Sequence, residues 1–545
     1  MGNELVITNI NNLDFEVMYN SKKYRYKSRE SSISKHNEGV KIFQHIVKQS
    51  VISCGIGSLL NLVEINFVSE LEEDIGLEFS FYSFLNNIRK SKCRYSWKGN
   101  KNVPEYRAYS MLISSYYRLN LFYYFKIAFG KVLFYSVKSC LNLTQFSQFK
   151  SCKYILHGAN EKYLDVILPL IEEIRKSSKA RLGILFNTRI SPKVNNTIIY
   201  NYGYLYKFNL NFISNYNKFK TEKKQIINSI PVNIDSFFFE KIINRIYAEN
   251  SFKLSILKSN ITSIIQERQL EIFGSTNHVG EIAKMFYVVC KSNNIATFGC
   301  KRGLSFDSPD NGMFLGDKLF VKSESEKRLF IRRGLESEKI FITGLPSNNE
   351  LIIKNLKSQK IAEKFKYENR IFDEKIILYL TQPCFMDFDI DEKKREIIDI
   401  ATSLKNLNAY LLIKLHPNET NVDIYEQIFN QIGFKKYKIY NNNLFDLLVS
   451  CDVALTKTSG TGVDALAIGK QLIIINYTHR TPSQVNLYEI YKAGIQVNSK
   501  EELAELFKKI VSNGFITGTY NSSNNDFIGL QDLNSTKRII SILNL

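Results

Sequence analysis

The sequence lacks the closely spaced cysteines that mark a zinc site or a disulfide framework. Its eight cysteines are scattered over 545 residues, and no two of them form a Cys-x-x-Cys pair. Neither kind of site is therefore expected. A reduced cytoplasm fits this cysteine usage.

Long apolar runs are also missing. No run of about eighteen uncharged apolar residues occurs, so we expect no transmembrane helix. Asn and charged residues interrupt the start of the chain, so we expect no signal peptide. These absences predict a cytoplasmic protein, with a peripheral position on the inner face of the cell membrane as the alternative.

Acidic residues are outnumbered, because 53 Asp and Glu stand against 73 Lys and Arg, which gives a net charge of +20. Chains this basic bind nucleic acid, anionic lipid, or acidic and phosphorylated substrates. The lysines are scattered, and no arginine-rich or Gly-flanked aromatic nucleic-acid motif occurs. We therefore expect an acidic substrate or an anionic membrane surface as a partner, and no nucleic acid.

The most informative stretch runs from residue 411 to residue 476. It opens with the apolar run Leu411–Leu415, which includes Lys414 and is followed by His416 and Pro417. A short apolar run of this kind predicts a buried strand. In open α/β sheets, ligands bind at the carboxyl ends of such strands. Lys414 and His416 are therefore candidate ligand-binding residues.

A second strand, Val453–Leu455, is followed by a turn with two hydroxyls, Ser459 and Thr461. Val463–Ile468 then has helical spacing, and Gly469 predicts the end of that helix. Backbone N–H groups at such a helix start, with two hydroxyls beside them, suit a phosphate or diphosphate. The alternative is that Ser459 merely caps the helix. The Lys-x-His-Pro strand end, one βα unit earlier, favours the phosphate interpretation.

The preceding half of the chain also predicts strands that alternate with helices. The run 153–157 predicts a strand, 163–176 a helix containing Pro169, and 180–186 a second strand, so the sheet is expected to be parallel. Pro169 argues against one unbroken helix. His157 and Glu161 fall at the carboxyl end of the first strand, where either chemistry or a solvated turn is expected.

A later strand, Leu270–Phe273, leads into a loop with Asn277, His278 and Glu281, and helical sequence follows. A His with a Glu three positions later at a helix start is compatible with acid–base catalysis. It is equally compatible with helix capping and compensation of the helix dipole. Both interpretations stay open on the sequence alone.

These patterns predict an α/β protein with two Rossmann-like domains, at 151–350 and 351–545, and an accessory N-terminal region at 1–150. Within that region, 6–26 predicts a strand pair, and 40–62 looks helical. The aromatic, lysine-bearing run 119–143 fits a core helix or a helix at a lipid interface.

Residues 152 to 545 resemble GT-B fold nucleotide-sugar transferases of bacterial surface polymers. The similar families are polysialyltransferases, Kdo transferases of capsule and lipopolysaccharide, and CDP-glycerol glycerophosphotransferases of teichoic acid synthesis. The matching segments, in chain order, are DKLFVKSESEKRLFIRRGLESEKIFITGLP, ILYLTQP, LLIKLHPNE and DVALTKTSGTGVDALAIGKQLIII.

The resemblance implies specific roles. His416 and Pro417 would contact the donor phosphate or leaving group, and Ser459 and Thr461 would bind phosphate oxygens. The acceptor base would be Glu281 or, as second choice, Glu161. The full expected sets are Glu281, His416, Glu161 and His278 for catalysis, and Thr381, Gln382, Lys414, Pro417, Thr458, Ser459, Gly460, Thr461 and Asp464 for the nucleotide-activated donor.

One segment departs from the resemblance, because Lys301-Arg302-Gly303 stands where related families often carry Gln-His-Gly. Two cations there would suit an acidic acceptor. We therefore expect a metal-independent glycosyltransferase of cell-envelope biosynthesis. It would use a CMP-, CDP- or UDP-linked donor and a glycan or lipid-linked oligosaccharide acceptor. The loops that follow Leu415 and Leu455 contain no Asp-x-Asp motif, so no obligatory cofactor or metal is expected. The alternatives are a UDP-sugar 2-epimerase-like isomerase or hydrolase, and a non-catalytic glycan- or nucleotide-binding module.

Overall fold

The computed structural model separates the chain into two compact units. The first comprises 1–164, 179–299 and 309–318, and the second comprises 165–178, 300–308 and 319–545. The predicted domain boundaries near 150 and 350 stay predictions. The structure describes residues 4–11, 14–19, 22–27, 81, 94–98, 152–158, 163–186, 197–201, 205, 212–228, 236–266, 270–278, 280–301, 314–383, 390–417, 419, 422–441, 443–477, 488, 493–513 and 525–545. The predicted helices at 40–62 and 119–143 lie outside these residues, as do Glu161, Arg302 and Gly303.

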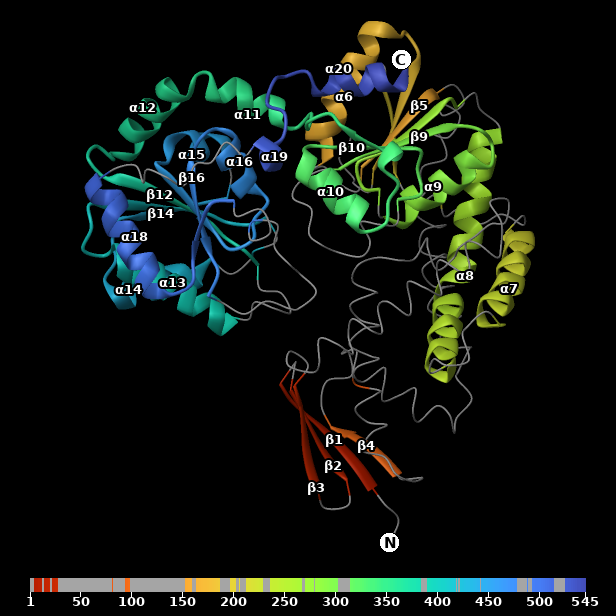
Figure 1. The fold of residues 1–545 in the computed structure, drawn as a ribbon, viewed down its shortest axis with the longest axis horizontal. Helices are drawn as coiled ribbons and strands as arrows, with labels where there is room; N and C mark the ends of the chain where they lie inside the picture. The colour runs from red at the N-terminus through yellow and green to blue at the C-terminus, as the bar shows by residue number, and fades with distance from the viewer. Residues whose placement is uncertain are drawn as a thin grey trace. The chain divides into compact units, whose positions relative to one another are not determined.

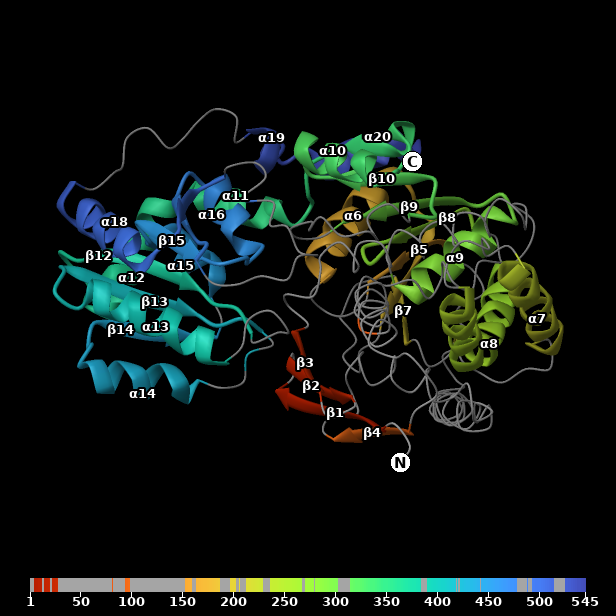
Figure 2. The ribbon, with the colours of Figure 1, turned by 60° about the horizontal axis from the view of Figure 1, so that its bottom comes forward.

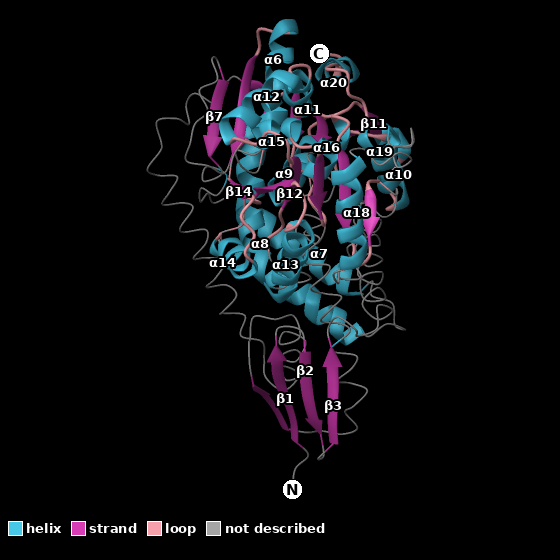
Figure 3. Ribbon diagram, turned by 90° about the vertical axis from the view of Figure 1, so that its left-hand side faces the viewer, coloured by secondary structure: helices cyan, strands magenta, loops and turns pink. Residues whose placement is uncertain are grey.

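The N-terminal region contains a sheet of four strands in the order β3-β2-β1-β4. Its members are β1 (Glu4–Asn11), β2 (Asp14–Tyr19), β3 (Lys22–Lys27) and β4 (Arg94–Lys98). Strands β1, β2 and β3 lie side by side (Figure 3) and pair antiparallel, whereas β4 pairs with β1 in parallel. Ile7 and Val17 face each other across β1 and β2 and are both fully buried. The predicted strand pair is thus confirmed and belongs to a larger sheet.

A seven-stranded sheet has the order β11-β10-β9-β8-β5-β6-β7. Its members are β5 (Cys152–His157), β6 (Arg181–Phe186), β7 (Thr197–Asn201), β8 (Ile272–Ser275), β9 (Ala296–Cys300), β10 (Lys318–Val321) and β11 (Ile340–Ile342). Strand β5 pairs in parallel with both β6 and β8, as expected for βαβ crossovers. The strand order reverses between β5 and β8, which makes the sheet doubly wound.

The helices of this part of the chain are α6 (Leu164–Ser177), α7 (Phe212–Asn228), α8 (Ser236–Gln266), α9 (Glu281–Lys291) and α10 (Glu324–Arg332). Helices α6, α9 and α10 lie between strands as predicted, whereas α7 and α8 follow one another directly. Helix α6 runs through Pro169 as one element, so the expected interruption there is wrong.

A six-stranded parallel sheet forms the C-terminal part, in the order β14-β13-β12-β15-β16-β17. Its members are β12 (Lys375–Leu380), β13 (Ala409–Lys414), β14 (Tyr437–Tyr440), β15 (Val453–Thr456), β16 (Gln471–Ile475) and β17 (Ile495–Val497). Figure 1 labels its strands β12, β14 and β16. Numbered along the chain, the order is that of the Rossmann fold, third-second-first-fourth-fifth-sixth. The predicted α/β class with two Rossmann-like sheets, as in the GT-B architecture, is thereby confirmed.

Helices cover both faces of the six-stranded sheet, as Figure 2 shows. Ile376, Leu378 and Leu380 of β12 pack into one apolar core with α12, α15 and α16, whereas Ile377 and Tyr379 pack into a second core with α13, α14 and α18. Because side chains alternate along a strand, two buried faces require a nearly continuous apolar run. The helices of this part are α11 (Asn348–Asn355), α12 (Ser358–Asn369), α13 (Ile390–Leu404), α14 (Asp423–Ile432), α15 (Leu444–Ser450), α16 (Thr461–Ala467), α18 (Lys500–Asn513), α19 (Asn525–Ile528) and α20 (Ser535–Leu543).

Among the residues that the structure describes, no helix has the length and apolar content needed to cross a lipid bilayer.

Two glycines in the six-stranded unit allow a test of this packing. Gly469, the predicted end of α16, and Gly494 have φ angles of +77° and +76°. A Cβ at Gly469 would meet no atom within 4 Å, whereas one at Gly494 would lie 2.8 Å from the carbonyl oxygen of Leu472. We expect Gly469→Ala to lower the free energy of unfolding by about 1 kcal/mol through backbone strain alone. Gly494→Ala should cost about 2 to 3 kcal/mol, because strain and overlap combine. Urea unfolding measures both, and equal losses would contradict the close approach at Gly494.

Candidate functional site

Three neighbouring strands of the six-stranded sheet end together in polar residues. Strand β12 lies between β13 and β15, and Leu380 at its end is in register with Lys414 on one side and Thr456 on the other. The segments after these strands carry most of the predicted donor-binding residues, among them Thr381, His416 and Ser459. They therefore meet at one edge of the sheet. The strand order reverses between β12 and β15, which is where open α/β sheets bind ligands.

The turn after β15 is fastened to the end of β12. The hydroxyl of Thr456 donates to the carbonyl oxygen of Leu380 at 3.0 Å and accepts from the backbone N–H of Ser459 at 3.2 Å. The hydroxyl of Thr458 donates to the side-chain oxygen of Gln382 at 3.2 Å. The two segments that flank the reversal of strand order are thus held side by side.

The two hydroxyls of that turn form a pair. The oxygens Oγ of Ser459 and Oγ1 of Thr461 lie 2.6 Å apart. Helix α16 has Gly460 as its N-cap, without a capping bond from a side chain, so the alternative role of Ser459 as a helix cap is wrong. The hydroxyl of Tyr488 donates to the carbonyl oxygen of Ser459 at 2.7 Å and so stabilises the turn.

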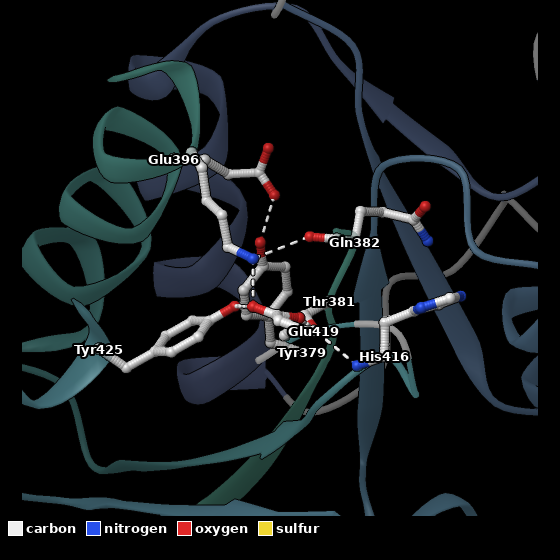
Figure 4. Close-up of polar contacts among 8 residues, drawn as sticks. Tyr379, Thr381, Gln382, Glu396, His416, Glu419 and Tyr425 are labelled. Carbon is white, nitrogen blue, oxygen red and sulfur yellow. Dashed lines mark hydrogen bonds and ion pairs between the residues drawn. The ribbon is translucent and has the colours of Figure 1, made fainter. Parts of the chain in front are cut away.

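His416 lies in a tight turn after β13. Its backbone N–H donates to the hydroxyl oxygen of Thr381 at 2.9 Å, and its carbonyl oxygen accepts from the N–H of Glu419 at 2.9 Å. The residue is half-buried and Pro417 is exposed. Figure 4 shows the imidazole of His416 and the side-chain amide of Gln382 projecting to the same side, away from Glu419 and Tyr425. These two hydrogen-bonding side chains therefore lie on the same side of the strand ends.

Lys414 and Asp464, the other charged residues expected at this site, interact with groups of the protein itself. The Lys414 ammonium donates to the carbonyl oxygen of Leu415 at 2.7 Å. Burial lowers the pKa of Lys414, and the Glu419 carboxylate opposes that shift. Asp464 lies in the first turn of α16. Burial lowers the pKa of Lys322, and the carboxylates of Glu326 and Asp464 oppose the shift, so Asp464 acts on a cation of the protein itself.

A buried charged layer beneath this edge was not predicted. The Glu419 carboxylate pairs with the ammonium of Lys393 and accepts from the Tyr425 hydroxyl at 2.6 Å. Nearby, the Tyr379 hydroxyl donates to Glu396 at 2.6 Å, and burial raises the pKa of Glu396. In the sequence, only a Glu three positions after His416 and a Lys near the start of a helix could have indicated this ion pair. Neither feature is specific for a buried ion pair.

The acid–base residues expected in the other unit are placed less favourably for catalysis. His278 is 3% exposed, and its ring meets Phe314 edge-on at 5.8 Å between centroids. Glu281 is the first residue of α9, where the helix dipole favours a carboxylate. Its side chain is 22% exposed and forms an ion pair with Lys253 of α8. Glu281 is therefore the more accessible of the two.

His157, at the carboxyl end of β5, is a core residue. It is 1% exposed, and its Nδ1 lies 2.7 Å from the hydroxyl oxygen of Ser275. Burial lowers its pKa to about 3. His157 therefore carries no charge at neutral pH and contributes to packing rather than to an exposed site.

No cluster of three or more metal-ligating side chains occurs among the residues that the structure describes.

No protein-family model matches the chain, and no curated protein is similar to it in sequence. Several solved structures are similar. One is the UDP-GlcNAc 2-epimerase of Neisseria meningitidis bound to UDP-GlcNAc, with 13% identity, a TM-score of 0.46, and coverage of 72% of this chain and 99% of that chain. A variant of the wall teichoic acid polymerase TagF has 11% identity, a TM-score of 0.47, and coverage of 78% and 98%. Anabaena HepE in complex with UDP and glucose has 11% identity, a TM-score of 0.43, and coverage of 72% and 99%.

The burial of His157 predicts a specific pH dependence. Its folded pKa of about 3 lies below the unfolded value of 6.5. Between these values the unfolded chain binds a proton that the folded chain does not, so stability is complete above pH 6.5 and falls as the pH is lowered. His157 contributes up to about 1.4 kcal/mol per pH unit to this slope. The free energy of unfolding, measured with urea at several pH values between neutral and acidic, should depend less steeply on pH in His157→Gln than in wild type.

Gln427→Ala, an exposed change on α14 that removes no titratable group, is the control and should leave the dependence of stability on pH unchanged. If His157→Gln does not fold, the His157 imidazole is titrated by NMR in the wild type. Protonation of that ring near neutral pH would contradict its burial.

Proposed function

We propose that the chain is a glycosyltransferase. It moves a sugar, or a sugar-like or polyol-phosphate unit, from a CMP-, CDP- or UDP-linked donor to a glycan or lipid-linked acceptor of the bacterial cell envelope. The observation that carries this proposal is the meeting of the β13, β12 and β15 ends, which brings His416, Thr381 and Ser459 to the edge where the strand order reverses. Nucleotides bind at this position in Rossmann-type sheets.

The chemistry of transfer suits these groups. Breaking the bond between the donor unit and phosphate leaves negative charge on the departing nucleotide, and preorganised hydrogen-bond donors stabilise that charge. The His416 imidazole projects from its turn, and the Ser459 and Thr461 hydroxyls lie 2.6 Å apart. In the proposal, the imidazole donates to the leaving phosphate and the hydroxyls bind its oxygens.

The turns on either side of the strand reversal would bind the rest of the donor. Gln382 projects beside His416, and Thr458 donates to its side-chain oxygen. Amide and hydroxyl groups of this kind form directional hydrogen bonds with ribose or base. Pro417 follows β13, Gly460 follows β15, Asp464 lies in the first turn of α16, and Lys414 is the last residue of β13.

The acceptor hydroxyl needs a general base. Glu281 is proposed for this role, because its carboxylate is partly exposed at the start of α9, with Glu161 as the second candidate. The net charge of +20 supports an acidic acceptor and a peripheral association with an anionic membrane surface.

Nucleotide binding tests the proposal directly. Wild-type protein is screened by thermal shift with CMP, CDP, UDP and GDP. We expect one cytidine or uridine nucleotide to stabilise the fold, because a ligand at about 100 times its Kd adds about 2.7 kcal/mol. Ser459→Ala should weaken that shift, since it removes one of the paired hydroxyls. Gln427→Ala, an exposed change on α14, serves as control and should leave the shift unchanged. If no nucleotide stabilises the protein, the proposal is wrong and a non-catalytic module remains.

Turnover tests the role of the imidazole. We expect His416→Ala to lower transfer by about 100-fold or more, with the unfolding temperature of the ligand-free protein unchanged. Conversion of the donor in the absence of any acceptor would instead indicate a 2-epimerase-like isomerase or a hydrolase. Undiminished transfer by His416→Ala would remove this residue from the mechanism.

We further propose that transfer needs no divalent metal, because in the proposal the imidazole and the two hydroxyls supply the hydrogen bonds to the leaving phosphate. The expected result is that exhaustive treatment with EDTA leaves the transfer rate unchanged within about twofold, since no metal-bound oxygen takes part. Loss of activity that Mg²⁺ or Mn²⁺ restores would contradict this expectation.

A further inference from the structure

A buried ion pair lies directly beneath the candidate site. The side chains of Glu419 and Lys393 are 4% and 3% exposed. Two charges in such a position are costly unless they are paired and fully hydrogen-bonded. Here the Glu419 carboxylate accepts from three donors, namely the Lys393 ammonium, the Tyr425 hydroxyl and the Thr381 hydroxyl. The carboxylate is thus held by groups from three separate segments of the chain.

One of these contacts closes a ring that includes His416. The His416 N–H donates to the hydroxyl oxygen of Thr381, and the Thr381 hydroxyl donates to the Glu419 carboxylate. The Glu419 N–H returns to the His416 carbonyl oxygen at 2.9 Å. Figure 4 shows the His416 backbone nitrogen on the side of Thr381 and the imidazole projecting away from it. The backbone on both sides of His416 is therefore fixed by contacts that end on Glu419.

Lys393 extends the same network to the neighbouring strand end. Its ammonium, besides pairing with Glu419, donates to the carbonyl oxygen of Gln382 at 2.8 Å and lies over the Tyr425 ring at 5.4 Å. Lys393 belongs to α13 and Tyr425 to α14, which cover one face of the sheet. These helices thereby fix the ends of both β12 and β13.

From this geometry we propose that Glu419 and Lys393 are positioning residues, which hold the His416 turn against the end of β12 so that the imidazole faces the leaving phosphate. The proposal rests on the role of His416 in the proposed function. Neither side chain is placed to touch the donor, since both are buried below the edge. Their effect on transfer must therefore pass through His416.

Glu419→Gln is the sharpest substitution, because it keeps the shape and changes the hydrogen bonding. A carboxylate accepts on both oxygens, whereas a glutamine amide accepts on one side and donates on the other. Three donors converge on Glu419, so the amide would oppose at least one of them. The turn that holds His416 should then shift.

The neighbouring carboxylate Glu396 offers a matched control. It is 1% exposed and accepts from the Tyr379 hydroxyl, and its other oxygen has no hydrogen-bond partner among the described residues. An amide therefore fits there without opposing a donor of this network. Glu396→Gln removes a buried carboxylate from the same helix as Lys393 without touching the His416 ring of contacts, and it should leave transfer within about twofold of wild type.

The kinetic test compares single and double substitutions. We expect Glu419→Gln to lower kcat about 10- to 100-fold, since a displacement of about 1 Å costs on this order, with the KM for the donor within about threefold. In a His416→Ala background, Glu419→Gln should cause no further loss, because residues that act through one another are not additive. Losses that multiply in the double variant would overturn the proposal, as would wild-type kcat in Glu419→Gln.

A second readout does not depend on turnover. The chain has six histidines, and the His416 imidazole signal is assigned in an NMR spectrum by its loss in His416→Ala. Glu419→Gln should shift that signal, whereas Glu396→Gln should leave it in place. An unmoved signal in Glu419→Gln overturns the positioning role even if no donor is ever found. Failure of the wild type to bind nucleotide would instead count against the proposed function.

Discussion

The candidate site depends on one arrangement, the parallel pairing of β12 with β13 on one side and β15 on the other. Leu380 is in register with both Lys414 and Thr456, so the three strands stop at one level. The segments that follow these strands contain Thr381, His416 and Ser459, and each of these residues places a polar group at the sheet edge. A change in strand order would separate these groups without altering any of them. The Rossmann order of the sheet is therefore the first requirement for the proposed chemistry, ahead of the identity of any single side chain.

Beneath that edge the protein keeps charge where an apolar core would be expected. Glu419 and Lys393 are nearly inaccessible, and replacing such a pair by apolar residues is often neutral or stabilising. An apolar pair, however, could not accept the hydroxyl proton of Thr381 or bind the carbonyl oxygen of Gln382. The directional bonds of the ion pair fix the strand ends relative to one another, which dispersion contacts do less specifically. The buried charge is thus explained by geometry rather than by stability.

The sequence predicted the elements that carry dense apolar runs. Strands β12, β13, β15 and β16 are buried on both faces, so their composition alone marks them. Strand β14 is different, because its residues from Tyr437 to Tyr440 are all partly or fully exposed, and an edge strand of this kind leaves no such run. The Thr197–Asn201 strand was likewise missed within a polar stretch. Glu419, in the loop after β13, pairs with Lys393 of α13, which is 26 positions away in the sequence. A local sequence pattern cannot predict a contact between residues so far apart.

The two histidines at strand ends show how position along a strand affects the exposure of a side chain. His157 is the last residue of β5 and is still paired, in register with Leu185 and Ser275, so its side chain is confined by neighbouring strands and is buried. His416 lies two residues beyond the last paired residue of β13, where the backbone turns and the imidazole projects. Leaving the ladder is necessary but not sufficient, since His278 lies three residues past β8 and is nonetheless 3% exposed. Glu281, which also follows β8, keeps 22% of its side chain exposed and is the more accessible of the two residues.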